Sequence, residues 1–129
     1  MKKLLFVTTV LFLSCAFSPQ KKTKIIFFGD SITELGVKEK PYRGYILELE
    51  DKSKAENKSD QYDFIGSGIS ANKVYDLYLR LEEDVLRKNP DVVFIYVGVN
   101  DVWHKTLLGT GTDADKFEKF YLAILKKLK

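Results

Sequence analysis

The stretch "IIFFGDSITELG" (25–36) decides the fold expected for this chain. Four apolar residues, Ile25–Phe28, run directly into Gly29, Asp30 and Ser31, after which the sequence turns polar. A short apolar run that ends at a glycine predicts a buried strand. Such a strand would deliver the Ser31 hydroxyl at its tip, where an enzyme could hold a nucleophile. What would take the proton of that hydroxyl is an open question, because the chain has one histidine.

Two further apolar runs predict strands at Tyr62–Ile65 and Val92–Val97. The second run is continuous and rich in β-branched residues, so we expect it to be buried on both faces of a sheet. Helical patterns separate the strands, and the first of them gives way to the polar segment 50–61. The stripes of the three expected helices are Tyr45, Ile46 and Leu49; Val74, Leu77, Tyr78, Leu81 and Val85; and Phe117, Phe120, Tyr121, Ile124, Leu125 and Leu128. This βαβαβα order predicts an α/β fold with a parallel sheet covered by helices.

Length and charge exclude several classes of protein. The chain has 129 residues, which suits one domain with a modest core, and its 45% hydrophobic and 30% charged residues are typical of a globular protein. The net charge of +3 includes Lys2 and Lys3, so the rest of the chain is nearly neutral. This balance does not indicate a nucleic-acid-binding surface, and we expect no nucleic-acid partner.

The first residues predict an export signal. "MKK" is a short positive region, and the apolar segment 4–14 has the length of a signal-peptide core. We therefore divide the chain into a signal over residues 1–16, a polar linker over 17–23 and a domain over 24–129. The expected location is bacterial and exported: periplasmic or outer-membrane lipoprotein, or secreted protein.

Two processing routes stay open for that signal. "FLSC" resembles a loose lipobox, in which Cys15 would become the lipidated first residue and tether the protein to a membrane. Cleavage after Ala16 would instead satisfy the small-x-small rule and release a free protein. On either route the domain keeps no cysteine, so we expect neither a disulfide nor a thiolate metal site.

Three different chemical groups follow the three predicted strands. "GDSITELG" supplies the hydroxyl of Ser31, "GSGISAN" the backbone amide of Gly68, and "GVNDVWH" the side-chain amide of Asn100. Ligands of open α/β sheets bind beyond the carboxyl ends of the strands, where these segments would meet. Acyl transfer requires such a set, because a hydroxyl attacks the carbonyl carbon while hydrogen-bond donors stabilise the negative oxygen.

Each residue also has a simpler explanation. Ser31 could cap the helix that follows the strand, and Asp30 could bond to backbone in a turn, which is the role we prefer for it. The glycines of the second segment could relax a tight turn. Asn100 and Asp101 could form an Asx turn or a helix cap. The ordered combination at three successive strand ends favours the catalytic interpretation.

These segments resemble the blocks of the GDSL, or SGNH, hydrolases, which are serine esterases and lipases on a flavodoxin-like α/β/α fold. "GDSI" (29–32) is similar to the first block, whose serine is the nucleophile, and that serine falls on Ser31. The stretch 66–77 is similar to the second block and places an oxyanion-hole glycine on Gly68. "GVND" (98–101) matches the third block, whose oxyanion asparagine falls on Asn100. The resemblance therefore implies a three-layer fold, of which this chain would form about three strands and three helices.

The chain departs from the family pattern at two places. Gly66 and Ala71 stand where many members of the family have asparagine and glycine. The C-terminal Asp-x-x-His block, which supplies the general base, has no match, and we expect the chain to be the N-terminal part of a longer hydrolase. His104 lies on a predicted loop at the catalytic edge of the sheet. We interpret it as a loop or cleft residue; the alternative is a replacement base that Asp101 orients.

The sequence thus predicts an exported serine ester hydrolase that is weak or inactive by itself. Its substrate would be a small-molecule or glycan ester, and the residues indicate no cofactor and no metal. Two alternatives stay open. One is a non-catalytic flavodoxin-like module that binds a phosphate at the Ser31 and Thr33 loop. The other is an inactive lipoprotein fragment.

Overall fold

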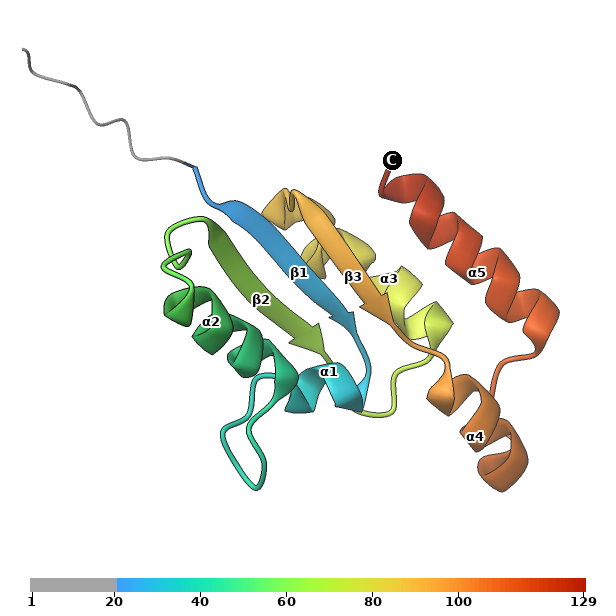
Figure 1. Ribbon diagram of the computed structural model, residues 1–129. Helices are drawn as coiled ribbons and strands as arrows, with labels where there is room; N and C mark the ends of the chain where they lie inside the picture. The colour runs from blue at the N-terminus through green and yellow to red at the C-terminus, as the bar shows by residue number, and fades with distance from the viewer. Residues whose placement is uncertain (1–20) are drawn as a thin grey trace, which may run out of the picture.

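The computed structural model describes residues 21–129 and contains a parallel sheet of three strands (Figure 1). The strands are β1 (Thr23–Gly29), β2 (Tyr62–Gly68) and β3 (Val92–Tyr96), in the order β2-β1-β3. This order is that of the first three strands of a flavodoxin-like sheet. In the register of the sheet, Gly29 lies beside Gly68 on one side and Tyr96 on the other. The predicted parallel α/β fold is confirmed.

Three of the helices differ from the expectation. The helical elements are α1 (Ser31–Leu35), α2 (Tyr45–Ala55), α3 (Val74–Asp84), the 3-10 turn η1 (Leu86–Lys88), α4 (Val99–Leu108) and α5 (Ala114–Lys127). The three predicted helices correspond to α2, α3 and α5. The apolar patterns do not predict α1 or α4, and the segment of α4 is expected to be a loop. Helix α2 continues into the segment predicted to be irregular.

The helices cover the two faces of the sheet, which gives three layers (Figure 1). Alternate residues of β1 point to opposite faces, so Ile26 and Phe28 pack against α3 and α5, while Phe27 faces the side of α2. Strands β2 and β3 lie on opposite sides of β1. Right-handed crossovers therefore place α2 and α3 on opposite faces. The core between the sheet, α3 and α5 holds Ile26, Phe28, Val74, Leu77, Leu81, Val85 and Ile124.

Strand β3 corrects one prediction, because it is buried on only one face. Val93 and Ile95 pack against the core, whereas Phe94 and Tyr96 are 54% and 57% exposed. The cause is the position of α2, which packs over β2 rather than over β3. A continuous apolar run does not distinguish a strand buried on one face from a strand buried on both, because both kinds of strand can have this sequence pattern.

The N-terminal predictions lie outside the described residues. The export signal over residues 1–16, Cys15 and Ala16 fall there, as does most of the linker. In the part that the structure describes, no helix has both the length and the apolar character needed to span a bilayer.

Candidate active site

The three predicted site segments meet at one edge of the sheet (Figure 1). The carboxyl ends of β1, β2 and β3 lie side by side, and the chain continues from them into α1, the loop before α3, and α4. Because β2 and β3 flank β1 on opposite sides, the strand order reverses at this edge. In open α/β sheets such a switch point is where ligands bind.

Asp30 and not Ser31 caps helix α1. One carboxylate oxygen of Asp30, Oδ1, accepts a hydrogen bond of 3.0 Å from the Ile32 backbone N–H, as an N-cap residue does. The backbone role that we preferred for Asp30 is therefore confirmed, and the capping alternative for Ser31 is wrong. Ser31 is the half-buried first residue of α1, and its hydroxyl is not used by the cap.

Gly68 packs directly against the backbone of α1. A Cβ at this position would overlap Glu34, Thr33 and the Asp30 carbonyl, so only glycine fits. The Ile69 N–H donates to the Gly29 carbonyl at 3.2 Å and thus points toward β1. Successive N–H groups of a strand point in opposite directions, so the Gly68 N–H is directed away from β1.

Asn100 lies in the first turn of α4 and is 5% exposed. Its side-chain Nδ2 donates a 3.0 Å hydrogen bond to the Asn72 carbonyl in the loop between β2 and α3. An amide NH₂ has two donors, so this bond fixes the plane of the group and leaves its second N–H for another acceptor. Gly98, just before α4, has a φ of 132°, which only glycine adopts without strain.

Asp101 joins α4 to α3 rather than to His104. Both of its carboxylate oxygens lie 3.2 Å from the Val74 N–H, in the first turn of α3. A buried carboxylate is well placed there, because it satisfies an N–H that the helix leaves unpaired and complements the helix dipole. Asp101 is 1% exposed. This arrangement does not support the expectation that Asp101 orients His104.

His104 lies on helix α4, one turn beyond Asn100, and not on a loop as predicted. It is half-buried. Residues four apart share one face of a helix, so His104 and Asn100 lie on the same side of α4. None of the hydrogen bonds found within residues 21–129 joins the His104 ring to Ser31 or to Asp101. Its role as a replacement base stays a prediction.

A carboxylate on α1 holds the loop that follows β2. One oxygen of Glu34 accepts hydrogen bonds of 2.6 Å from the backbone N–H and from the hydroxyl of Ser70. These two bonds lower the pKa of the Glu34 carboxyl. The next residue, Ala71, has a φ of 64°, a conformation that favours glycine. The loop therefore keeps the backbone shape that a glycine would give it, although the residue is alanine.

Comparison with known proteins agrees with this geometry. The model of the GDSL-like lipase/acylhydrolase family matches residues 27–129. The chain belongs to this family.

The GDSL relatives that it resembles include acetylxylan esterases. An acetylxylan esterase of Geobacillus stearothermophilus is 33% identical over 114 residues, which are 81% of this chain and 52% of the relative. The crystal structure of the acetyl xylan esterase AlAXEase superposes with a TM-score of 0.78 at 63% identity, over 81% of this chain and 52% of that one. The chain thus spans about half the length of these relatives.

Variants of the acetylxylan esterase Axe2 from Geobacillus stearothermophilus are among the similar solved structures. Three of them are catalytic mutants in which a serine, an aspartate or a histidine is replaced by alanine, at 29–30% identity and a TM-score of 0.67. Each superposition covers 81% of this chain and 53% of the Axe2 chain.

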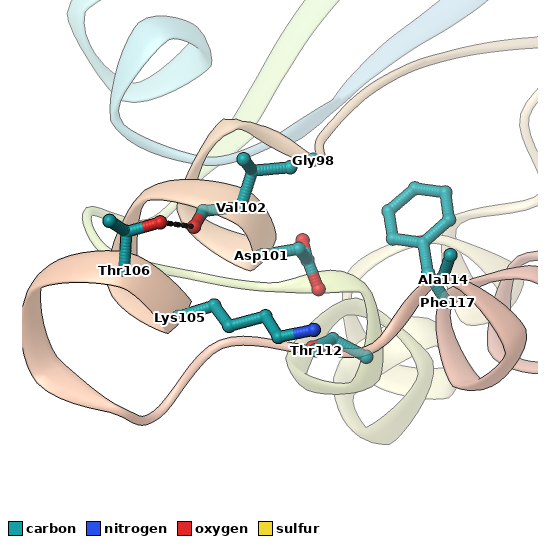
Figure 2. A pocket seen from close by; sticks show the side chains of 8 residues that line it. All are labelled: Gly98, Asp101, Val102, Lys105, Thr106, Thr112, Ala114 and Phe117. Carbon is teal, nitrogen blue, oxygen red and sulfur yellow. Dashed lines mark hydrogen bonds between the residues drawn. The ribbon is translucent and has the colours of Figure 1, made fainter.

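A cavity of about 440 Å³ opens beside α4 in this GDSL chain (Figure 2). It lies between α4 and the start of α5, and residues of both helices, such as Val102 and Phe117, line it. Ser31, Gly68 and Asn100 are not among the lining residues, so the cavity is separate from the predicted site. Within residues 21–129, no three His, Cys, Asp or Glu side chains lie together as metal ligands would.

Two residues of the GDSL site escaped the sequence analysis. Asn72 supplies the carbonyl that holds Asn100, and the Arg80 side chain on α3 reaches back to the strand ends. An asparagine in a loop and an arginine on a helix are common in any α/β protein. Their partners lie on other elements, so only the packing of those elements reveals them.

Proposed function

We propose that the protein is a serine esterase that removes acetyl groups from a carbohydrate such as xylan. Its family membership and the acetylxylan esterases among its relatives support this proposal. The observation that carries it is the hydrogen bond from Asn100 to the Asn72 carbonyl, which orients an amide donor at the edge of the sheet where Ser31 begins α1.

In the proposed reaction, Ser31 Oγ attacks the acetyl carbon of the substrate. The carbonyl oxygen becomes negative and is stabilised by the backbone amides of Ser31 and Gly68 and by the Asn100 side chain. The base takes the Ser31 proton and passes it to the sugar oxygen as that oxygen leaves, which yields an acetyl-enzyme. Water, deprotonated by the same base, then releases acetate and restores Ser31.

The described residues include only one candidate for the general base, His104. The catalytic mutants of Axe2 replace a serine, an aspartate and a histidine. This chain has the single histidine His104, and its neighbour Asp101 is bound to α3. We therefore propose that the 129 residues alone hydrolyse esters slowly. A serine hydroxyl without an efficient base is a weak nucleophile at neutral pH, so its attack on the ester is slow.

Hydrolysis of 4-nitrophenyl acetate and of acetylated xylo-oligosaccharides tests the proposal. We expect weak turnover that Ser31→Ala abolishes and that the control Ser59→Ala, at an exposed serine, leaves unchanged. Equal turnover of Ser31→Ala and the unsubstituted protein would contradict the proposal. Turnover at ordinary enzyme rates that is lost in both Ser31→Ala and His104→Ala would assign the base to His104.

The structure does not favour the phosphate-binding alternative. Thr33, which would have to face the phosphate together with Ser31, is fully buried, and its hydroxyl lies 3.4 Å from the Tyr45 hydroxyl. The helix that follows Ser31 has five residues. A phosphate would gain little from so short a helix dipole.

We further propose that the protein is exported through residues 1–16. The support is the sequence of that segment, with its positive start and apolar core. Mass spectrometry of the mature N-terminus in a bacterial host tests the route. A diacylated Cys15 that disappears in Cys15→Ser indicates the lipoprotein, an N-terminus at residue 17 indicates the free protein, and an unprocessed chain contradicts export.

A further inference from the structure

Arg80 on α3 is hydrogen-bonded to the end of β1, to β2 and to the loop that precedes α3. Its Nη2 donates to the Gly29 carbonyl at 2.7 Å, and its Nε donates to the Asn72 side-chain oxygen at 2.8 Å. Both Nη atoms lie within 3.3 Å of the Ser67 carbonyl, and Nη1 also reaches the Ser67 hydroxyl at 3.2 Å. Nη1 donates in addition to the Asp84 carboxylate. The five N–H donors of the guanidinium thus all have acceptors.

The guanidinium of Arg80 is held rigidly in place. It lies 4.4 Å from the centre of the Phe28 ring, stacked on a core residue of β1, and its side chain is only 14% exposed. Asp84, one helical turn away, neutralises the charge. A planar fork of this kind loses little freedom when its bonds form, and a lysine cannot reproduce it.

The contact with Ser67 acts on the predicted oxyanion donor Gly68. The Ser67 C=O and the Gly68 N–H belong to one peptide unit, which is planar and trans. When Arg80 holds the carbonyl, it therefore also fixes the direction of the N–H on the opposite side of the same plane. A positive partner on the oxygen polarises the peptide further and strengthens the N–H as a donor.

The contact with Asn72 acts on the second predicted donor. The Asn72 side chain accepts from Arg80, and its backbone carbonyl accepts from Asn100 Nδ2. The position of the Asn100 amide thus depends on a residue whose side chain is fixed by Arg80. The Gly29 carbonyl, also bound to Arg80, lies two residues before Ser31.

We propose that Arg80 is a positioning residue that holds the nucleophile turn and the predicted oxyanion donors Gly68 and Asn100 in one geometry. This inference rests on the proposed esterase function for its catalytic meaning. The network itself can be tested without activity. Arg80 touches neither the substrate nor the reacting atoms in this proposal, because it acts through Gly29, Ser67 and Asn72.

Nitrogen-15 NMR of the 129-residue chain tests the geometry in the Arg80→Lys variant. We expect the Gly68 backbone amide and the Asn100 side-chain amide to shift, and the two Asn100 amide protons to move closer together in frequency. Two controls separate positioning from general stability: Arg87→Lys on η1, whose exposed arginine pairs with Glu83, and Ile124→Val, which deletes a buried methyl group. Both should leave the Gly68 and Asn100 signals in place.

Asn72→Ala supplies a second and independent variant. It removes one acceptor of Arg80 but keeps the backbone carbonyl that holds Asn100. We expect the Asn100 signals to move and the Gly68 signal to stay, because Ser67 still contacts Arg80. If Arg80→Lys does not fold, Asn72→Ala alone tests the positioning role of Arg80. Asn100 signals that do not move in Asn72→Ala would then overturn the inference.

The kinetic result separates the inference from the proposed function. We expect Arg80→Lys to lower kcat for acetyl esters by on the order of 10²-fold with little change in KM, as misplaced catalytic groups do. Moved NMR signals combined with hydrolysis that does not depend on Ser31 would support the role of Arg80 and contradict the esterase. Hydrolysis that depends on Ser31, with signals and kcat unchanged in Arg80→Lys, would overturn the role of Arg80 alone.

Discussion

Asp30 and Ser31 are neighbours in the chain, but they have different tasks. Asp30 is fully buried and uses one carboxylate oxygen to cap α1. Its other oxygen is buried with no hydrogen-bond partner among the described residues. Because Asp30 satisfies the first turn, the Ser31 hydroxyl need not do so, and it stays free for chemistry. The order Asp-Ser after the strand therefore separates the capping residue from the residue that we predict to be the nucleophile.

Asn100→Ala tests the oxyanion role at the level of a single residue. Loss of one such donor typically costs 10²–10³ in kcat, and we expect about this loss in the hydrolysis that depends on Ser31. The control Gln61→Ala removes an exposed amide far from the site and should have no effect. An Asn100→Ala protein within about a factor of two of the unsubstituted one would show that Asn100 is not a donor.

Ala71→Gly should stabilise the protein, because Ala71 has a φ of 64°. A side chain in this left-handed conformation costs about 1–2 kcal/mol, which glycine avoids in part at the expense of its own entropy. We expect the melting temperature to rise by a few degrees. The matched control Ala55→Gly, at the end of α2, should lower it. A lower melting temperature for Ala71→Gly would contradict the strain.

At the scale of elements, helices α1, α3 and α4 are joined by carboxylates that bond to backbone N–H groups. Asp101 links the start of α4 to the start of α3, and Glu34 links α1 to the loop before α3. The three site segments are thus connected to one another by hydrogen bonds as well as by the sheet. This explains how residues on three separate segments can keep one geometry.

The Glu34 link should make stability depend on pH. Its pKa is lowered in the folded protein, so the charged form is favoured by folding. The stabilisation that the charged Glu34 gives to the folded protein is present above the pKa of about 4.3 that a glutamate has in the unfolded chain. It is lost as the pH falls through the lower pKa that Glu34 has in the folded protein. Thermal unfolding should therefore show Glu34→Gln to be less stable than the unsubstituted protein at pH 7, with the difference vanishing in acid.

Glu118→Gln, an exposed carboxylate on α5, is the control for this pH dependence. It should not reproduce the effect. Ser70→Ala should lower stability at pH 7 in the same direction as Glu34→Gln, because it removes the hydroxyl that bonds to Glu34. A stability difference between Glu34→Gln and the unsubstituted protein that stays constant down to pH 3 would contradict the role of the charge.

At the scale of the whole molecule, one face of the sheet is aromatic and partly open. The Phe27 and Phe94 rings stack with centroids 5.3 Å apart. A cavity of about 440 Å³ beside them is lined by apolar and aromatic residues from the sheet and α2: Ile25, Phe27, Tyr45, Leu49, Tyr62, Phe64 and Phe94. We expect an exposed apolar surface of this kind to bind hydrophobic molecules.

Phe94→Thr should reduce this binding without disturbing the strand. Threonine is favoured in strands, so β3 should persist. We expect the fluorescence of a bound anilinonaphthalene sulfonate dye to fall in Phe94→Thr. The control Leu79→Thr replaces an exposed residue of α3, on the opposite side of the sheet, and should change it little. Equal dye fluorescence for both variants would place the dye elsewhere.

Local patterns in the sequence were enough to predict the strands, the parallel sheet, three of the helices and the segments of the candidate site. Strand periodicity and turn residues are short-range properties, and the order of elements then limits the topology. The same patterns missed α1, which has only five residues, and α4, which follows directly after the third predicted site segment. They also predicted that β3 is buried on both faces, although one of its faces is exposed.

Only the tertiary structure decided which groups act on one another. It showed that Asp30 rather than Ser31 caps α1, that Asp101 bonds to α3 rather than to His104, and that Asn72 and Arg80 hold the predicted donors. Apart from the cap of α1, which joins residues two apart, these contacts join different elements, and the Arg80 bond to Gly29 spans 51 positions of the chain. A local sequence pattern cannot report such contacts, because they depend on how the completed helices and strands pack.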